Sequence, residues 1–411
     1  MFIMRGTIFK QLNHTIMKNS VHKTARIHGM DSLRANMMLL GLVLHTAITY
    51  GTYNYSPVWS MKDPNSNNLF FDWLLAYIHI FRMPVFFVVA GFFGALLFYE
   101  RSPKKMLINR INRIFFPFII FLFILWPLVI GGFGFSNTVF AGTDSPLDFL
   151  LNYYGNIMNY IPQRTIHLWF LYYLLLYSIT FYLLALLFKR LPAFTSLLHR
   201  YFEKIIQLPF AKVILFSLMT FGVLILMGNT WVATSTSFIV DLNTFVFYLM
   251  FYAFGWVFFK SKHLLDTFKK YDIGYTILGT ILITVRFFRS DPLPYESMLL
   301  NSLSVWFLIF GITGLFLRYF NSGSERMRYI SDASYWVYLL HLPILSFLPG
   351  LLAPYDLSPF MKFTLAFVIA NLICFVTYHY LVRASVIGQF LNGRRYKRVS
   401  LLPKLSLSFQ K

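Results

Sequence analysis

Charge is scarce in this sequence and mostly of one sign. Only 12% of the 411 residues are Asp, Glu, Lys or Arg, whereas about a quarter are charged in an ordinary soluble domain. The single cysteine, Cys374, excludes an internal disulfide and a thiolate metal centre, and no metal site is expected. Hydrophobic residues make up 57% of the chain, which excludes disordered and fibrous classes. The composition therefore indicates a membrane protein.

Ten largely apolar stretches follow one another along the chain, each close to the 20 or so residues that a spanning helix needs. We therefore predict an all-α polytopic membrane protein with about ten transmembrane helices in one bundle. The shortest stretch contains Arg286. The ten stretches lie near 33–51, 71–99, 114–133, 166–188, 210–230, 238–259, 273–288, 297–318, 334–354 and 361–382.

Lys and Arg residues are distributed unevenly between the two sides of this predicted bundle. One set of alternate loops, together with both chain ends, holds 30 of the 36, and Arg82 lies inside the membrane. Because acidic residues divide almost evenly between the sides, this bias predicts that both termini are cytoplasmic. The net charge of +21 then reflects topology, and no nucleic-acid partner is expected. The opposite loops hold only Lys62, Arg164, Arg286, Arg289 and Lys362.

A single membrane domain is predicted at 31–385, between a basic cytoplasmic segment at 1–30 and a basic cytoplasmic tail at 386–411. The longest loop, about 134–165, is too short for a second domain. Residues 1–30 lack the apolar core and cleavage site of a secretory signal peptide. The functional site is therefore expected within the helix bundle, among membrane lipids.

Charged or ionisable side chains deep within the predicted spans are few, and they are His or Arg. Such groups are costly at membrane depth and are functional candidates by default. No carboxylate lies in the middle of a span, which argues against an ion-coupled transporter. The candidates are His45, His79, Arg82, His167 and His341.

Arg34 and His45 lie on one face of the first predicted span. They are eleven positions apart, which is about 20° from three full turns and about 16 to 17 Å along the axis. We expect Asp31 and Ser32 to cap this helix at the cytoplasmic surface. A surface cation and a buried imidazole suit a ligand with phosphates outside and a reactive end inside. In the alternative interpretation, Arg34 is a membrane anchor and His45 a packing residue.

The second span places His79 and Arg82 on one face, with Pro84 close behind them. Pro84 removes a backbone donor and is expected to kink the helix, whereas Gly91 allows close helix approach. A buried Arg82 needs an anion or a dipole as its partner. Of the candidates, Arg82 is the hardest to explain by structure alone.

Two further pairs of residues belong to the candidate site. Arg110 and Arg113 are three residues apart at the cytoplasmic end of the third span, where they suit either phosphate binding or a positive-inside flank. His167 and Trp169 open the fourth span from the outside.

The ninth span contributes two more candidates from one helical face. Tyr338 and His341 follow Asp332 and Ser334, and we expect Asp332 to cap this helix. His341 would then lie about 10 Å inside the membrane.

Five motifs in this order resemble those of the acyltransferase 3 family of ten-span membrane O-acyltransferases. The resemblance covers roughly 30–385, and within the family the first two motifs are most similar to the periplasmic glucan biosynthesis protein C branch, which is associated with glucan succinylation. The motifs are MDSLRANMMLLGLVLH at 30–45, FRMPVFFVVAGFF at 81–93, RINRIFFP at 110–117, HLWFL at 167–171 and SDASYWVYLLHLP at 331–343.

The resemblance implies transfer of a succinyl or acetyl group from cytoplasmic acyl-CoA to a hydroxyl of a periplasmic or cell-surface glycan. The protein would lie in a bacterial inner membrane, with acyl-CoA as co-substrate and no permanently bound cofactor. Arg34, Arg110 and Arg113 would bind the CoA phosphates. His45 would act as general base or as covalent acyl carrier, two mechanisms that the sequence leaves open.

The remaining candidates receive roles by their depth and spacing. Arg82 and His79 are assigned to the catalytic group, stabilising the oxyanion or holding a succinyl carboxylate. Substrate-binding roles are assigned to His167, Trp169, Tyr338 and His341.

Two other functions remain open at this point. An exporter or flippase of a polar or lipid-linked glycan would use the same arginines for anionic head groups. A structural scaffold would leave the buried Arg82 and the aligned Arg34 and His45 unexplained.

Overall fold

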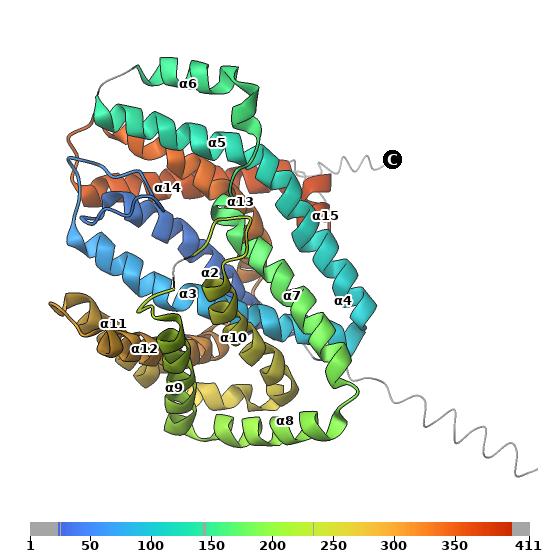
Figure 1. Cartoon of the computed structure of the whole chain (residues 1–411). Coiled ribbons are helices and arrows are strands. Elements are labelled where there is room, and N and C mark those ends of the chain that lie inside the picture. Colours follow the sequence, from blue (N-terminus) through green and yellow to red (C-terminus); the bar gives the residue numbers. More distant parts are fainter. Residues whose placement is uncertain (1–23, 25, 143–144, 233, 397–411) are drawn as a thin grey trace, which may run out of the picture.

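The computed structural model describes residues 24, 26–142, 145–232 and 234–396. Within these ranges the chain is built from helices, without strands, packed side by side in a bundle (Figure 1). The predicted segments 1–30 and 386–411 lie largely outside the described residues. The α-helices are α2 (His28–Ala47), α3 (Leu69–Leu96), α4 (Pro103–Arg110), α5 (Phe116–Ala141), α6 (Pro146–Gly155), α7 (Trp169–Phe188), α8 (Pro192–Gln207), α9 (Pro209–Met227), α10 (Leu242–Phe258), α11 (Asp272–Phe288), α12 (Pro294–Tyr319), α13 (Glu325–Leu352), α14 (Pro359–Thr377) and α15 (Val386–Asn392).

Each of the ten predicted spans coincides with a helix, and the all-α membrane fold is confirmed. Eight helical segments of the described chain are long and apolar enough to cross a bilayer. The other two predicted spans correspond to α2, which carries polar residues in its first turns, and to α11, which has 17 residues. Which side holds the termini stays a prediction.

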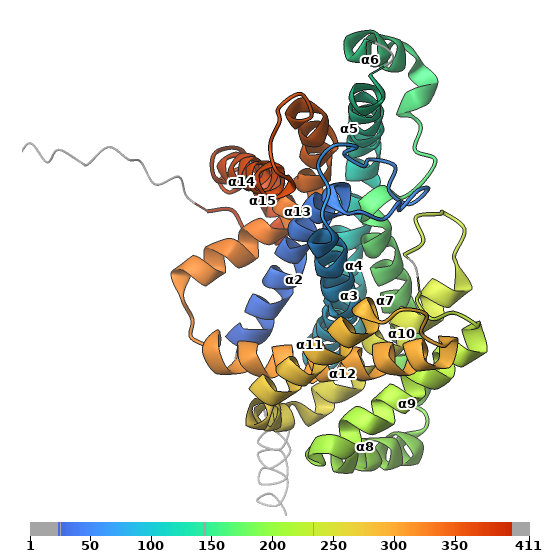
Figure 2. The same ribbon diagram turned by 90° about the vertical axis from the view of Figure 1, so that its left-hand side faces the viewer.

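Helices α2 and α3 occupy the centre of the bundle. Helix α2 packs against α3, α12, α13 and α14, and α3 packs against α10, α11 and α12 as well (Figure 2). The peripheral helices α6 and α8 lie beside α5 and α9 at opposite ends of the molecule (Figure 1). The two central helices carry four of the predicted site residues, Arg34, His45, His79 and Arg82.

Glycines bring the backbones of α3 and α10 into contact, as expected for Gly91. A Cβ atom at Gly91 would lie 2.1 Å from the carbonyl oxygen of Tyr252, and one at Gly255 would lie 1.8 Å from that of Val88. No larger residue fits at either position without separating the helices. This close packing fixes the face that α3 presents to α2.

The predicted caps of two helices are wrong. Helix α2 begins at His28, so Asp31 lies in its first turn, and the backbone N–H of Gly29 donates instead to Asn321 Oδ1 at 2.9 Å. Helix α13 begins at Glu325, and Asp332 lies two turns inside it. Both carboxylates instead accept bonds from arginines outside their own helices, which the local pattern of a single helix does not reveal.

Candidate functional site

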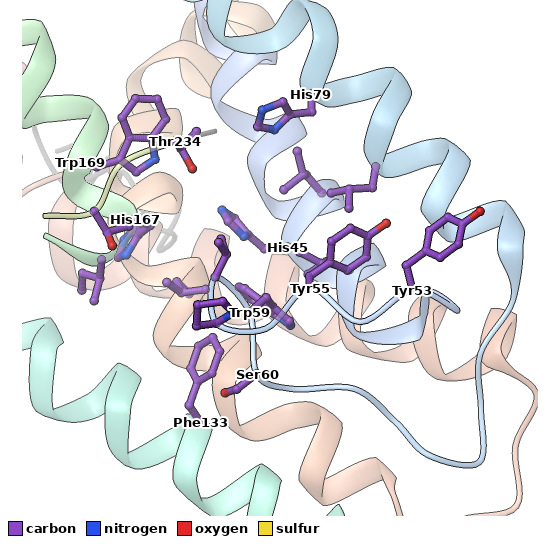
Figure 3. A pocket seen from close by; sticks show the side chains of 18 of the residues that line it. His45, Tyr53, Tyr55, Trp59, Ser60, His79, Phe133, His167, Trp169 and Thr234 are labelled. Atoms are coloured by element: carbon purple, nitrogen blue, oxygen red, sulfur yellow. The ribbon is translucent and has the colours of Figure 1, made fainter. Parts of the chain in front are cut away.

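A cavity of about 830 Å³ lies between the central helices and the connecting loops on the side of the bundle with few basic residues. That volume suits a ligand of two or three sugar rings, within the usual range of small-molecule sites. Figure 3 shows His45, His79 and His167 facing this space from three different helical segments. Its aromatic walls include Trp59, Trp126, Trp169 and Trp231.

His45 lies in the last turn of α2 and faces the cavity beneath the ring of Trp59 (Figure 3). The two rings are stacked, with centroids 5.3 Å apart and planes inclined by 18°. Trp59 is held in turn by a 3.1 Å hydrogen bond from Nε1 to Thr49 Oγ1 and by edge contact with Phe133. Neither ring nitrogen of His45 has a hydrogen-bond partner among the described residues. Nδ1 is enclosed by the protein, so Nε2 is the ring nitrogen that remains available to a substrate.

The loop that carries Trp59 is fixed at its start by Asp72, a buried carboxylate in the first turn of α3. Asp72 accepts hydrogen bonds from the backbone N–H of Thr52 at 2.6 Å and of Tyr53 at 3.2 Å, and from the Tyr55 hydroxyl at 2.8 Å. Burial and this hydrogen bond raise the pKa of Tyr55, so its hydroxyl stays protonated as a donor.

A second anchor holds the other end of the same loop. Asp63 and Lys362 form an ion pair at 2.9 Å in which each side chain is only 1% exposed. The Ser66 hydroxyl also donates to the Leu357 carbonyl at 3.0 Å. Loop 51–68 is thus tied to α3 and α14, and Trp59 is held against His45.

His341 and His167 stand next to His45 and form a cluster of three imidazoles. The ring centroids of His45 and His341 are 5.3 Å apart, and those of His341 and His167 are 5.4 Å apart. His341 Nδ1 lies 2.7 Å from the Tyr338 carbonyl oxygen and His167 Nε2 lies 3.2 Å from that of Leu339. Because a carbonyl only accepts, these nitrogens carry the hydrogens and the opposite nitrogens are free acceptors.

Arg82 extends from α3 to the same cluster, across the surface of α2 at Gly41. A Cβ atom at Gly41 would lie 2.3 Å from Arg82 Nη1 and 3.9 Å from His341 Nε2. The guanidinium therefore occupies the space that a side chain would fill on the Arg34–His45 face. Within the described residues Arg82 has no carboxylate partner, and its buried Nε has no hydrogen-bond partner.

His79 lies one turn from Arg82 on α3, in a part of the cavity wall that also contains Trp231 and Asn301. Its ring stacks on Trp231 with centroids 4.5 Å apart, and its Nε2 has no partner. Asn301 also lines the cavity, donating from Nδ2 to the Thr230 carbonyl while its Oδ1 has no partner. Two unpaired polar atoms in one wall suit the hydroxyl groups of a sugar, which both donate and accept hydrogen bonds.

Trp169 and Tyr338 support the site from opposite sides. Trp169 lines the cavity, whereas the Tyr338 hydroxyl donates to the His167 carbonyl at 2.8 Å and fixes the start of α7. Tyr338 therefore positions His167 in this structure.

Within the described residues, no group of three or more His, Cys, Asp or Glu side chains is arranged to hold a metal ion.

Arg34, Arg110 and Arg113 form a second group, in which the charges are close enough to interact. The side chain of Arg34 is 40% exposed and lies 3.9 Å from Asp31 and over the ring of Phe93. Arg110 faces inward beside the Tyr252 hydroxyl, and its Nε and Nη2 have no partner in full hydrogen-bond geometry. Since α2 is continuous from His28 to Ala47, Arg34 and His45 share one face as predicted.

Arg113 differs from Arg110 because it already has a protein partner. Its Nη1 donates at 2.8 Å to the carbonyl of Leu391, at the C-terminal end of α15. Tyr335 donates to the backbone carbonyl of Arg113 at 2.9 Å. Arg113 therefore joins the third span to the C-terminal segment, and its predicted phosphate contact stays a prediction.

Several residues of the site lie outside the predicted set. Trp59 and Asp72 act through an irregular loop that has no periodic pattern, and Asn301 looks like an ordinary polar residue near a helix start. Lys362 pairs with a carboxylate 299 positions away in the chain. Arg286 could have been identified from the sequence, since a cation on the side with few basic residues is unusual.

Comparison with known proteins agrees with this arrangement. The acyltransferase domain family known as acyltransferase 3 matches residues 27–379. Glucans biosynthesis protein C of Escherichia coli K12 is 24% identical over 384 residues, covering 90% of this chain and 95% of the relative. The protein of that name from Shigella dysenteriae serotype 1 is 25% identical over 381 residues, with the same coverage. No solved structure is significantly similar to the chain.

Proposed function

The chain belongs to the acyltransferase 3 family, and from that premise we propose that it transfers an acyl group from cytoplasmic acyl-CoA to a hydroxyl of a periplasmic glycan. It is an integral membrane protein, and we place it in the bacterial inner membrane. The observation that carries the proposal is the cluster of His45, His167 and His341 beside an unpaired Arg82 at the inner end of the cavity.

The acyl donor is assigned to the cytoplasmic side. Arg34 and Arg110 have guanidinium groups available for phosphate oxygens there. A pantetheine arm running along α2 from Arg34 would bring the thioester to His45, about 16 to 17 Å deeper. The succinyl or acetyl identity of the acyl group is part of the proposal.

The acceptor is assigned to the cavity, which the loops of the opposite side surround. Its tryptophans offer flat apolar surfaces for sugar rings, and the unpaired His79 Nε2 and Asn301 Oδ1 suit hydrogen bonds with hydroxyl groups. The relatives' printed name, glucans biosynthesis protein C, supports a glycan acceptor. Donor and acceptor would meet at His45 from opposite ends.

In the direct mechanism His45 acts as general base. Its free ring nitrogen takes the proton from the acceptor hydroxyl while the hydroxyl oxygen attacks the thioester carbonyl carbon. Arg82 stabilises the negative charge that forms on the carbonyl oxygen. The carbon–sulfur bond then breaks, and the imidazolium returns its proton to the departing CoA thiolate.

In the covalent alternative the His45 nitrogen attacks the thioester itself. CoA leaves as the thiol with the N–H proton of the imidazole, and the acceptor hydroxyl then attacks the acyl-imidazole and gives its proton to the released histidine. The two mechanisms differ in one observable, since only the second leaves labelled acyl group on the protein when the acceptor is absent.

The decisive experiment uses purified protein in detergent with radiolabelled acetyl-CoA and succinyl-CoA and a periplasmic glucan fraction. We expect wild type to consume one thioester and to label the glucan. His45→Ala should lose both activities by a factor of about 10² to 10⁴. His199→Ala, on the peripheral helix α8, is the matched control. If wild type consumes no acyl-CoA although folded, the proposal fails and glycan export becomes the function to assay.

A further inference from the structure

Five basic residues lie on the side of the bundle that carries the cavity, and three of them have partners. Lys362 and Arg289 form ion pairs at 2.9 and 2.7 Å, and Lys62 donates to a backbone carbonyl. The other two, Arg164 and Arg286, have neither an ion pair nor a hydrogen bond within the described residues. These two are also the arginines that line the cavity.

The charges of Arg164 and Arg286 are not neutralised by nearby carboxylates. Arg286 is half-buried in the last turn of α11, and its Nε is enclosed without a partner. Arg164 is exposed at the loop that leads into α7. Asp72 also lines the cavity, but it is 1% exposed and its oxygens accept the hydrogen bonds of loop 51–68. An unpaired cation in a site is a receptor for an anion.

Arg286 lies in the last turn of α11, which packs against the start of α3, and this places the anion at that level of the cavity. Trp73 Nε1 donates at 3.1 Å to Thr284 Oγ1, which sets α11 against the first turn of α3. His79 lies six residues further along α3 than Trp73, about 9 Å deeper. A succinyl group is only about 5 Å long at 1.5 Å per bond. An anion at the level of Arg286 is therefore better explained by the acceptor than by the acyl group.

We propose that Arg164 and Arg286 form an anion subsite for a phosphate or carboxylate substituent on the acceptor glycan. The inference rests on the proposed function, because it assigns the cavity to the acceptor. The aromatic walls contact the sugar faces, and the two guanidinium groups supply charge-assisted hydrogen bonds to the substituent. An anionic oligosaccharide would then be preferred over its neutral counterpart.

The test measures binding rather than turnover, using the full chain in detergent. Four tryptophans line the cavity, so ligand binding is followed by tryptophan fluorescence. The probes are gentiobiose, gentiobiose 6′-phosphate and succinyl-CoA. We expect the phosphate ester to bind at least tenfold more tightly than the disaccharide, since each charge-assisted hydrogen bond contributes a factor of about ten or more.

The substitutions Arg164→Gln and Arg286→Gln should each reduce this preference about tenfold while leaving gentiobiose affinity within twofold. Arg289→Gln is the matched control, because Arg289 follows α11 directly but is paired with Glu296 at 2.7 Å. It should keep the full preference for the ester.

Three results would overturn the proposal. The ester and the disaccharide could bind equally well, or Arg289→Gln could lose as much preference as Arg286→Gln. Alternatively, only succinyl-CoA binding could depend on Arg164 and Arg286, which would assign the anion to the acyl group. Failure of the proposed function is read separately, in the thioester assay, because binding of the sugars requires no turnover.

Discussion

Gly41 lies against Arg82, so the substitution Gly41→Ala should preserve the fold and abolish most of the acyl-transfer activity. A Cβ atom at Gly41 would lie 2.3 Å from Arg82 Nη1, whereas ordinary contacts begin near 3.4 Å. In Gly41→Ala the guanidinium must therefore move by about 1 Å, the shortfall from van der Waals distance. The atom displaced is the end of a flexible side chain, so the surrounding helices need not separate.

The expected loss follows from the proposed role of Arg82, which is to stabilise the developing oxyanion. A misplacement of about 1 Å in a catalytic group costs about 10²-fold in rate. Stability should not fall with it, because alanine is favoured over glycine inside a helix by about 0.5–1 kcal/mol. Turnover of acyl-CoA and the midpoint of thermal unfolding in detergent measure the two effects independently.

Two comparisons test whether Gly41→Ala acts through the Arg82 guanidinium. Gly222→Ala in α9 is the matched control, because a Cβ atom there would meet nothing within 4 Å. In an Arg82→Met background, Gly41→Ala should cause no additional loss, since it acts only through the displaced guanidinium. The reasoning is refuted if Gly41→Ala keeps the turnover of Gly222→Ala, or if its effect persists once Arg82 has been replaced.

Two further predictions address the ends of the site. Lys362→Met should lower the free energy of unfolding by about 3–5 kcal/mol, because it leaves the buried Asp63 carboxylate without its ion-pair partner. Adding Asp63→Leu should recover most of this loss, as measured by thermal unfolding. Wild-type stability of the single variant would contradict the prediction. Arg110→Gln should raise KM for acyl-CoA about tenfold with little change in kcat, since a phosphate contact lies far from the thioester. Arg101→Gln, at an exposed position, is the control. A selective loss of kcat would contradict phosphate binding by Arg110.

The helices and the central part of the site follow from the sequence for identifiable reasons. Apolar length predicts where helices lie, and residues at helical spacing on one helix necessarily share a face. Arg34 and His45 belong to the continuous α2, and His79 and Arg82 to α3, so their spacing carried over into the structure. The predicted and observed faces agree because the geometry of a single helix fixes which of its residues share a face.

Contacts that join distant segments could not be obtained in this way. Trp59 reaches His45 through a loop with no period, and that loop is held by Lys362 from the far end of the chain. Arg113 appeared equivalent to Arg110 by spacing, yet α15 folds back and supplies the Leu391 carbonyl to it. Such partners depend on how the bundle closes, which periodicity does not encode.

The lack of a carboxylate beside Arg82 is itself informative. Elsewhere the chain readily pairs its arginines, as in Arg318 with Asp272 at 2.6 Å and Arg394 with Asp332 at 2.5 Å. A thioester carbonyl is neutral before attack and carries negative charge only in the transition state. An unpaired guanidinium therefore favours the transition state over the bound substrate, whereas a carboxylate partner would cancel most of that difference. The same reasoning accounts for the position of Arg82 beside the imidazole of His341, without an ion pair among the described residues.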